Sequence, residues 1–232
     1  VAKRLALHLK DMARHGRGVQ ITSGNALAAR LAKSAIDLGI PIHTSGPASV
    51  LLVENGAVVG ARVAIEGREQ EVRARRGVVL ACGGFPHDVA RLTKAYPHVA
   101  RGGKHLSPTP VGNTGDGIRL AEDAGSSFKI RYPHAAAWMP VSQVPRRDGS
   151  FGVFPHLLDR YKPGIIGVTR KGTRFCNESD SYHDVGAAMI RACKGQSETA
   201  AWLICDAPTI AKYGLGYAKP APMPLGKFVA NG

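Results

Sequence analysis

A dense group of ionisable and hydrogen-bonding side chains occupies one segment in the C-terminal half of the chain. From Leu158 to Asp184 the sequence reads L-D-R-x-x-P-G-I-I-x-V-x-x-x-G-x-R-F-x-N-E-S-x-x-Y-x-D. A globular domain tolerates so many polar groups in one segment mainly where they pair with one another or meet a ligand. The segment is therefore predicted to face a substrate, and the alternative is a polar loop that enters a helix. The polar residues are Arg174, Asn177, Glu178, Ser179, Asp180, Tyr182, His183 and Asp184.

Local signals predict the elements that position this group. Pro163–Gly164 predicts a turn, and the apolar residues of 165–168 predict a short buried strand. Lys171–Gly172 is typical of the turn of a hairpin. Asp184 is predicted to cap a helix over 185–190, because an aspartate side chain accepts hydrogen bonds from the free backbone N–H groups of a first turn.

Two glycine-bearing segments further upstream predict that the backbone approaches another group closely. Residues 76–85, R-G-V-V-L-A-C-G-G-F, predict a buried strand that ends in a pair of glycines. Residues 112–118, G-N-T-G-D-G-I, predict a turn leading into a helix that stops at Gly125. A helix N-terminus offers backbone N–H groups to anionic or carbonyl oxygen atoms, although Asn and Asp beside Gly are also ordinary turn chemistry.

The remaining elements follow from apolar spacing and turn residues. Helices are predicted over 2–15 and 25–38, and residues 39–63 predict two strands, a turn and a third strand. Residues 133–150 predict a loop, and residues 201–206 predict a further strand. The chain therefore mixes helices and strands along its whole length.

Together these motifs resemble the flavoprotein-subunit superfamily of fumarate reductase and succinate dehydrogenase, and within it they are most like the 3-ketosteroid Δ1-dehydrogenases. In those enzymes an R-F-x-N-E-S-x-x-Y signature places a tyrosine beside the flavin, and Tyr182 stands at that position. The dicarboxylate-reducing members have an arginine there, four residues after the glutamate, as the proton donor. Tyrosine at this place makes a dicarboxylate reductase the less favoured interpretation.

The resemblance implies FAD as the cofactor and Tyr182 as the catalytic group, with Arg174, Asn177 and Glu178 as support on the substrate side. Cys82 replaces the threonine that is usual before the paired glycines. No His or Cys spacing typical of a metal site occurs, so no metal is expected. The residues that the resemblance assigns to the cofactor are Ala48, Ala81, Cys82, Gly83, Gly84, Asn113, Thr114, Gly115, Asp116 and Gly117.

The implied fold class is α/β with α+β insertions. Residues 1–138 would form part of a FAD/NAD(P)-binding Rossmann-like domain, and residues 139–232 the start of a fumarate reductase-type catalytic, or cap, domain. No G-x-G-x-x-G follows a predicted strand, although that motif holds the FAD pyrophosphate in such domains. We therefore expect an internal fragment that needs missing flanking segments of the same polypeptide, binds FAD weakly and is inactive alone.

Composition excludes several other classes. No apolar run approaches about 18 residues, so no transmembrane segment is expected. The four cysteines have no C-x-x-C spacing and suit a reducing, cytoplasmic compartment. The formal charge is +14, but the basic residues are scattered and accompany no nucleic-acid-binding motif, so no nucleic-acid partner is expected.

The reaction implied by the resemblance is the introduction of a C=C bond next to a ketone. A carbonyl acidifies the neighbouring C–H, a tyrosine takes that proton, and the flavin accepts a hydride from the adjacent carbon. The expected substrate is a ketosteroid or another cyclic ketone. Two alternatives remain open, a dicarboxylate oxidoreductase of the same superfamily and a non-catalytic binding module that only keeps the fold.

Overall fold

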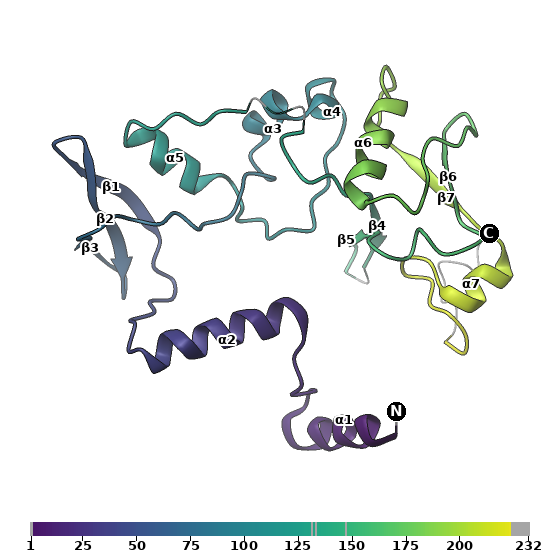
Figure 1. The fold of residues 1–232 in the computed structure, drawn as a ribbon, viewed down its shortest axis with the longest axis horizontal. Coiled ribbons are helices and arrows are strands. Elements are labelled where there is room, and N and C mark those ends of the chain that lie inside the picture. Colours follow the sequence, from purple (N-terminus) through teal and green to yellow (C-terminus); the bar gives the residue numbers. More distant parts are fainter. Residues whose placement is uncertain (1, 131, 133, 147, 224–232) are drawn as a thin grey trace. The chain divides into compact units, whose positions relative to one another are not determined.

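The computed structural model describes residues 2–130, 132, 134–146 and 148–223 (Figure 1). The chain forms two compact units, one of residues 2–49 and Ala61–Val72, the other of Val50–Gly60 and the described residues from Arg73 onward. The helices are α1 Ala2–His15, α2 Ser23–Asp37, α3 Val89–Ala95, α4 Pro97–Ala100, α5 Asp116–Asp123, α6 Tyr182–Ala192 and α7 Ala207–Tyr213. The strands are β1 Ala48–Glu54, β2 Ala57–Ile65, β3 Arg68–Arg73, β4 Val141–Pro145, β5 Phe151–Pro155, β6 Ile166–Thr169 and β7 Ala201–Ile204.

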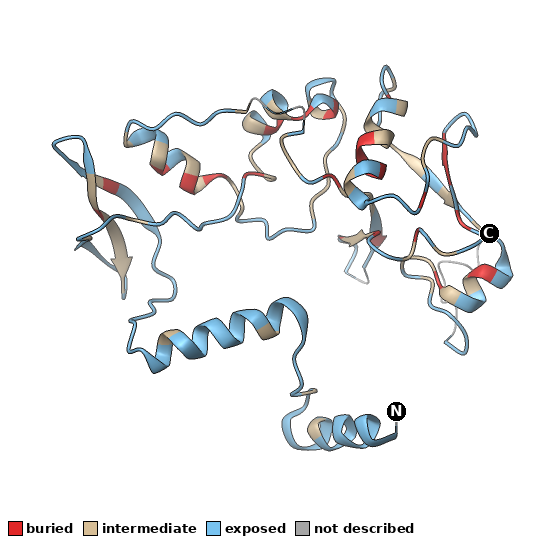
Figure 2. Cartoon of the chain, viewed as in Figure 1, coloured by how far each residue is buried: buried red, intermediate tan, exposed pale blue. Residues whose placement is uncertain are grey.

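The first two helices confirm the predictions made for 2–15 and 25–38. Their apolar residues recur at helical spacing, as Leu5, Leu9 and Met12 do in α1, yet neither helix has a buried residue. Figure 2 shows both helices as exposed along nearly their whole length. Within the described ranges, no helix combines the length and the apolar character that crossing a membrane requires.

Three strands pair in the order β1-β2-β3. The turn between β1 and β2 is Asn55–Gly56, where both φ angles are positive, at 50° and 78°. Such a turn matches the twist of the two strands that it joins, and Asn-Gly is its usual sequence. The prediction of a strand before Gly46 is wrong, because the structure has no strand there and the third strand is β3 instead.

Two pairs of antiparallel strands lie in the C-terminal half of the chain. Strand β4 pairs with β5 in a register that sets Ser142 opposite Phe154. Strand β6 pairs with β7, with Val168 opposite Trp202, so the predicted strands over 165–168 and 201–206 are confirmed. The predicted turn at Lys171–Gly172 is closed by a backbone hydrogen bond of 2.9 Å from the Gly172 N–H to the Thr169 carbonyl.

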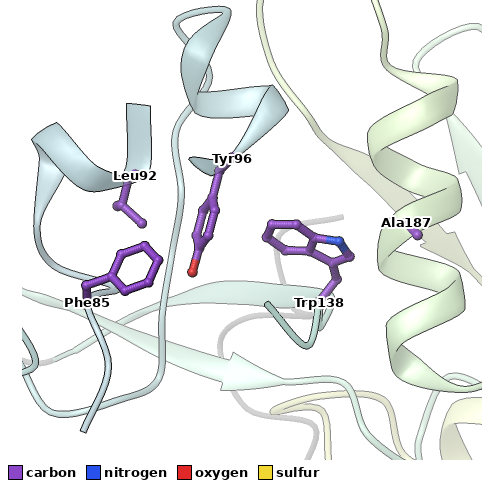
Figure 3. Packing of buried hydrophobic residues seen from close by; sticks show 5 residues of the cluster. All are labelled: Phe85, Leu92, Tyr96, Trp138 and Ala187. Atoms are coloured by element: carbon purple, nitrogen blue, oxygen red, sulfur yellow. The ribbon is translucent and has the colours of Figure 1, made fainter. Parts of the chain in front are cut away.

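An apolar cluster of buried residues joins α3 and α4 to α6. The Tyr96 ring lies between Phe85 and Trp138, with ring centroids 5.9 Å and 4.8 Å away (Figure 3). Helix α6 reaches this cluster through Gly186, because a Cβ atom there would lie 2.7 Å from the Cβ of Trp138. Only glycine therefore lets the helix backbone approach the tryptophan so closely. Leu92 and Ala187 complete the cluster.

The buried strand predicted within 76–85 is wrong. These residues form no strand, and the Val79 side chain is 89% exposed. A strand is stable only when neighbouring strands satisfy its backbone N–H and C=O groups. Among the described residues no strand pairs with this segment, so its apolar sequence alone does not produce the element.

The predicted cap at Asp184 is also wrong. Helix α6 begins at Tyr182, and its N-cap is Ser181. The Ser181 hydroxyl accepts a hydrogen bond of 3.2 Å from the Asp184 N–H and donates one of 2.7 Å to the Asp184 carboxylate. Serine caps a helix as well as aspartate does, and the acidic side chain in the first turn then suits the positive end of the helix dipole. As a result, Tyr182 is a helical residue.

The chain's two tryptophans give a matched test of this packing. Trp138 is 4% exposed and Trp202 is 46% exposed. We expect Trp138→Ala to lower the free energy of unfolding by about 3–5 kcal/mol, because it leaves a cavity against Tyr96. Trp202→Ala is expected to lower it by no more than about 1 kcal/mol. Urea titrations of both variants measure the difference, and equal losses would show that Trp138 does not organise the core.

Candidate active site

The two glycine-bearing segments predicted to bind a cofactor lie against each other. The N–H of Gly115 donates a hydrogen bond of 3.1 Å to the carbonyl of Gly84. A Cβ atom on Gly83 would lie 2.7 Å from Oδ1 of Asn113. Gly83 and Gly115 both have positive φ angles, 83° and 80°, which side-chain-bearing residues rarely adopt. The glycines are therefore what lets the two segments meet.

The second contact between these segments involves the start of α5. A Cβ atom on Gly117 would lie 3.2 Å from the sulfur of Cys82, and Cys82 itself is exposed. Ala81 and Thr114 are neighbours of these residues in the chain and lie in the same two segments. Ala48 is the first residue of β1 and belongs to the other compact unit. Within the second unit, the structure thus brings together the predicted cofactor residues of the two glycine-bearing segments.

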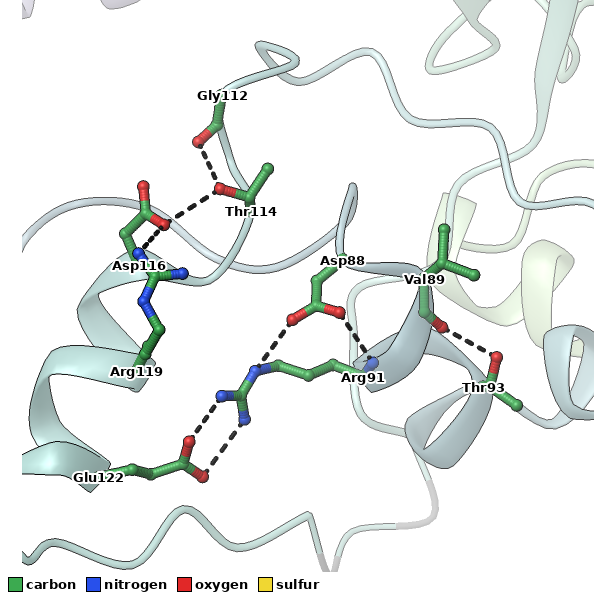
Figure 4. Close-up of polar contacts among 9 residues, drawn as sticks. All are labelled: Asp88, Val89, Arg91, Thr93, Gly112, Thr114, Asp116, Arg119 and Glu122. Carbon is green, nitrogen blue, oxygen red and sulfur yellow. Dashed lines mark hydrogen bonds and ion pairs between the residues drawn. The ribbon is translucent and has the colours of Figure 1, made fainter.

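Ion pairs involve both ends of α5 (Figure 4). Asp116 Oδ1 accepts hydrogen bonds from Arg119 at 2.8 Å and from the Thr114 hydroxyl at 3.2 Å. Arg91 on α3 donates to Glu122 on α5 at 2.6 Å and also pairs with Asp88, Nε to Oδ2, at 3.1 Å. The hydrogen bond from Arg91 lowers the pKa of the Glu122 carboxyl. Helix α5 is therefore held beside the core that contains Leu92.

A cavity of about 440 Å³ lies next to these segments. Gly84 and Asn113 form one part of its wall, and Gly186, Met189 and Ile190 of α6 form another. The wall between them combines aromatic rings with imidazoles, from Tyr96, His98, His105 and Trp138. Such a mixture of flat apolar surfaces and few polar groups is typical of sites that bind ring-shaped small molecules.

Two histidines form a neutral pair in this wall. His98 Nε2 lies 3.2 Å from His105 Nδ1, and the His98 side chain is 5% exposed. Burial lowers the pKa of His98, and burial together with the neighbouring His98 lowers the pKa of His105 to about 4. His98 Nδ1 is buried without a hydrogen-bond partner in the described part of the chain. Because an unpaired buried N–H is rarer than an unpaired acceptor, this favours a proton on His98 Nε2, donated to His105.

Two further histidines fix the orientation of Trp138. Its backbone N–H donates to His183 Nδ1 at 3.1 Å, and its indole N–H donates to His134 Nδ1 at 2.8 Å. Both imidazoles accept at Nδ1, so both carry their proton at Nε2 when neutral. Trp138 belongs to the buried apolar cluster and also forms part of the cavity wall.

Tyr182 is the first residue of α6 and is 41% exposed. It lies four and seven residues before Gly186 and Met189, so the three share one face of the helix. Tyr182 is not itself part of the cavity wall, because it stands one turn before the residues that are. Among the described residues its hydroxyl has no hydrogen-bond partner, so this group can meet a ligand.

The three residues predicted to support the substrate mainly pair within the loop before α6. Glu178 accepts from Arg174 Nη2 at 2.5 Å and from the Gly167 N–H at 2.7 Å. The hydrogen bond from Arg174 lowers the pKa of Glu178 to about 2. Asn177 Nδ2 donates to Asp180 at 3.0 Å. None of the three forms part of the cavity beside Trp138, so their geometry fits a role in holding the loop that ends at Tyr182.

Sequence reasoning missed several residues of this region. Arg160 is buried, and its guanidinium donates to the carbonyls of Glu178 and Asp180, the latter at 2.6 Å. Its position just before the Pro163–Gly164 turn carries no signal of that role. Tyr96, His98 and His105 were also missed, because they lie in a segment without a recognisable motif.

The sequence of the chain matches a known protein family. The model described as "FAD binding domain" matches residues 2–228. The chain belongs to this FAD-binding family. The match confirms FAD as the cofactor and confirms the predicted α/β flavoprotein fold.

Known relatives agree with this assignment. The chain is similar to 4-oxocyclohex-2-ene-1-carboxylate 5-dehydrogenase of Sinomonas cyclohexanicum, with 42% identity over 235 residues, 100% of this chain and 39% of that protein. It is also similar to the fumarate reductase (cytochrome) of Shewanella frigidimarina, with 32% identity over 152 residues, 62% of this chain and 24% of that protein.

A solved structure gives the same result. The crystal structure of 3-ketosteroid Δ1-dehydrogenase from Sterolibacterium denitrificans, in complex with 1,4-androstadiene-3,17-dione, matches with a TM-score of 0.78 and 30% identity. The match covers 96% of this chain and 40% of that chain. The resemblance to the ketosteroid dehydrogenase and fumarate reductase superfamily is therefore confirmed. The chain spans about two fifths or less of the length of these relatives.

The histidine pair predicts a pH dependence of stability. Both folded-state pKa values lie below the ordinary value of about 6.5, so the unfolded chain binds protons that the folded chain does not. Their contribution to stability is complete above about pH 6.5 and is lost as the pH falls from there towards 4. We expect His105→Phe to lose less stability than the wild type between pH 7 and pH 5, as measured by urea midpoints. His43→Phe, at an exposed position, is the matched control and should follow the wild type.

Proposed function

We propose that this chain is part of an FAD-dependent dehydrogenase that introduces a C=C bond next to the carbonyl group of a ring ketone. The observation that carries the proposal is the position of the cavity beside Trp138. One part of its wall is the Gly84 and Asn113 region assigned to the cofactor, and another is the face of α6 that begins with Tyr182. A ring in this cavity would therefore lie beside the segments assigned to the cofactor and about one helical turn from Tyr182.

The residues of the two glycine-bearing segments fit the chemistry of FAD. Asn113, Thr114 and Asp116 offer amide, hydroxyl and carboxylate groups, which suit the hydroxyl groups along the sugar chains of the cofactor. The missing side chains of Gly83 and Gly117 let the supporting backbone come close. When bound, the flavin supplies the acceptor for the hydride. In this proposal residues 1–138 belong to the cofactor domain and residues 139–232 to the cap domain.

The chain's own residues would orient the substrate and remove a proton. The rings of Tyr96 and Trp138 offer flat apolar surfaces against which a ring ketone can stack, and they exclude water from the reacting carbons. Tyr182 would take the proton from the carbon next to the carbonyl group. Tyr182 is the first residue of α6.

The substrate class is supported by the relatives that the chain resembles. One is named for a cyclohexene ring that carries an oxo group and a carboxylate, and another was solved with a steroid dienedione. An oxo group on a six-membered ring is common to both. We therefore assign the ring ketone as the shared chemistry.

Asp116 tests the assignment of the cofactor residues. In the protein encoded by the complete reading frame, Asp116→Ala is expected to lower flavin occupancy and leave the fold intact, because the side chain accepts hydrogen bonds but packs little of the core. Asp123→Ala, at the other end of α5, is the matched control. Flavin absorbance per protein, together with thermal melting, measures the outcome. Unchanged flavin content in the Asp116 variant would contradict the assignment.

Tyr182 tests the chemistry. Phenylalanine keeps the ring and removes the hydroxyl, so Tyr182→Phe in the complete protein should leave flavin content nearly unchanged. Turnover of a ring ketone should fall by roughly 10²-fold or more, the usual scale for a proton-transfer group. Tyr161→Phe, which removes an exposed hydroxyl from a loop, is the matched control and should remain active.

The same assay separates the alternative activities. Both proteins are supplied with a 3-ketosteroid, with a 4-oxocyclohexene carboxylate, and with succinate or fumarate. If Tyr182→Phe retains full turnover of a ring ketone, Tyr182 is not the catalytic group. If the wild type acts on the dicarboxylates alone, the ring-ketone proposal fails.

A further inference from the structure

A second cavity, of about 570 Å³, is lined by Ser142 and His156, and these two side chains are hydrogen-bonded in series with Asp159. The Ser142 hydroxyl on β4 lies 2.6 Å from His156 Nε2, and His156 Nδ1 lies 2.8 Å from Asp159 Oδ2. Serine, histidine and aspartate in this order are the groups that activate a hydroxyl for nucleophilic attack, and the arrangement is recognised by geometry rather than by sequence position. We propose that Ser142 is a nucleophile that reacts with small carboxylic esters.

The aspartate fixes the histidine in the tautomer that this chemistry requires. Asp159 Oδ2 also accepts from the Gly216 N–H at 2.9 Å, and Oδ1 accepts from the Arg160 N–H at 3.0 Å. Burial opposes ionisation, but these hydrogen bonds, above all that from His156, hold the pKa of Asp159 below its ordinary value. An ionised carboxylate is only an acceptor, so His156 carries its proton on Nδ1. Nε2 is then free to accept the proton of the Ser142 hydroxyl.

The histidine is held in place from several directions. Its backbone N–H donates to the carbonyl of Pro140 at 3.0 Å, and its carbonyl accepts from Arg160 Nε at 3.2 Å. The Phe154 ring lies edge-on to the imidazole, with centroids 5.2 Å apart. The β4–β5 register sets Ser142 directly opposite Phe154. The three groups are therefore positioned by the fold without any ligand, as an activated nucleophile requires.

The surroundings define the class of ester. Ser142 is exposed, so a reagent can reach its hydroxyl, whereas His156 is buried. The cavity wall beside them is mainly apolar, with Val144, Phe154, Trp202 and Tyr217 among its residues. A short, uncharged acyl group fits this wall, because burying a charge there without a partner would be costly. The wall also shares Leu106, Val141, Met189 and Thr199 with the cavity beside Trp138.

The reaction follows from these positions. Ser142 Oγ forms a bond to the carbonyl carbon of the ester while its proton passes to His156 Nε2. The bond from that carbon to the ester oxygen breaks, and the alcohol leaves with this proton. Water then attacks the acyl-serine, with its proton again passing through His156, and releases the carboxylic acid and the free serine. No oxidant, reductant or further reactant is needed.

The test uses a fluorophosphonate, which reacts with nucleophilic serines, and p-nitrophenyl acetate as the ester. We expect one phosphonyl group per chain, located on Ser142 by peptide mass spectrometry and absent in Ser142→Ala. Asp159→Asn removes the negative charge that holds the histidine proton on Nδ1. It should slow labelling and p-nitrophenol release by roughly 10²-fold or more. Ser150→Ala, in the β4–β5 turn, is the matched control and should label like the wild type.

Several results would overturn the proposal. Labelling at other serines, equal labelling rates for Asp159→Asn and the wild type, or equal rates for the native and the urea-treated chain would each do so. Circular dichroism of Asp159→Asn shows whether the variant is folded. If it is not, His156→Gln takes its place, and unchanged labelling in that variant contradicts the proposal as well.

Discussion

The close contact between α6 and Trp138 is the constraint on which the rest of the site depends. Because Gly186 has no side chain, the helix backbone can lie against the tryptophan, and the tryptophan in turn packs on Tyr96. This chain of contacts fixes α6 beside the segment that carries α3 and α4. It thereby sets where the cavity opens and where the helix start with Tyr182 stands. A larger residue at position 186 would push apart every wall that these elements form.

Sequence reasoning succeeded where structure is determined by local signals. The bounds of α1 follow from helical spacing, and the turn at Asn55–Gly56 follows from the preference for positive φ angles. The strand predicted near Val79 failed, because burial depends on partners that a local pattern does not reveal. The cap of α6 failed for a smaller reason, since Ser181 and Asp184 are both good capping residues and only geometry distinguishes them.

The candidate site shows the same division. The two glycine-bearing segments were predictable, because glycine at a turn before a helix has a known physical use. The residues that line the cavity were not, since Tyr96 and His105 reach it only through tertiary packing. The relay of Ser142, His156 and Asp159 depends on the register of β4 and β5, which no spacing in the sequence reveals.

Lys104 is a cationic side chain in the wall of the cavity beside Trp138. Arg91 and Arg174 are each bound by carboxylates, and the two imidazoles in the wall have lowered pKa values that keep them neutral at pH 7. The Lys104 charge matters for proton and hydride transfer, because a fixed charge in an apolar site acts strongly on any charge that develops nearby.

Because the two cavities share wall residues, a substitution at a shared position changes the shape of both. Leu106, Val141, Met189 and Thr199 each contribute to both spaces, so a mutation that enlarges one cavity also reshapes the other. Selection acting on one cavity therefore carries pleiotropic effects on its neighbour. Met189 is the shared residue best able to reduce the effect of one cavity's shape on the other, since an unbranched thioether side chain can repack toward either cavity. Adaptive changes in ligand preference should accordingly appear first at positions that face one cavity alone.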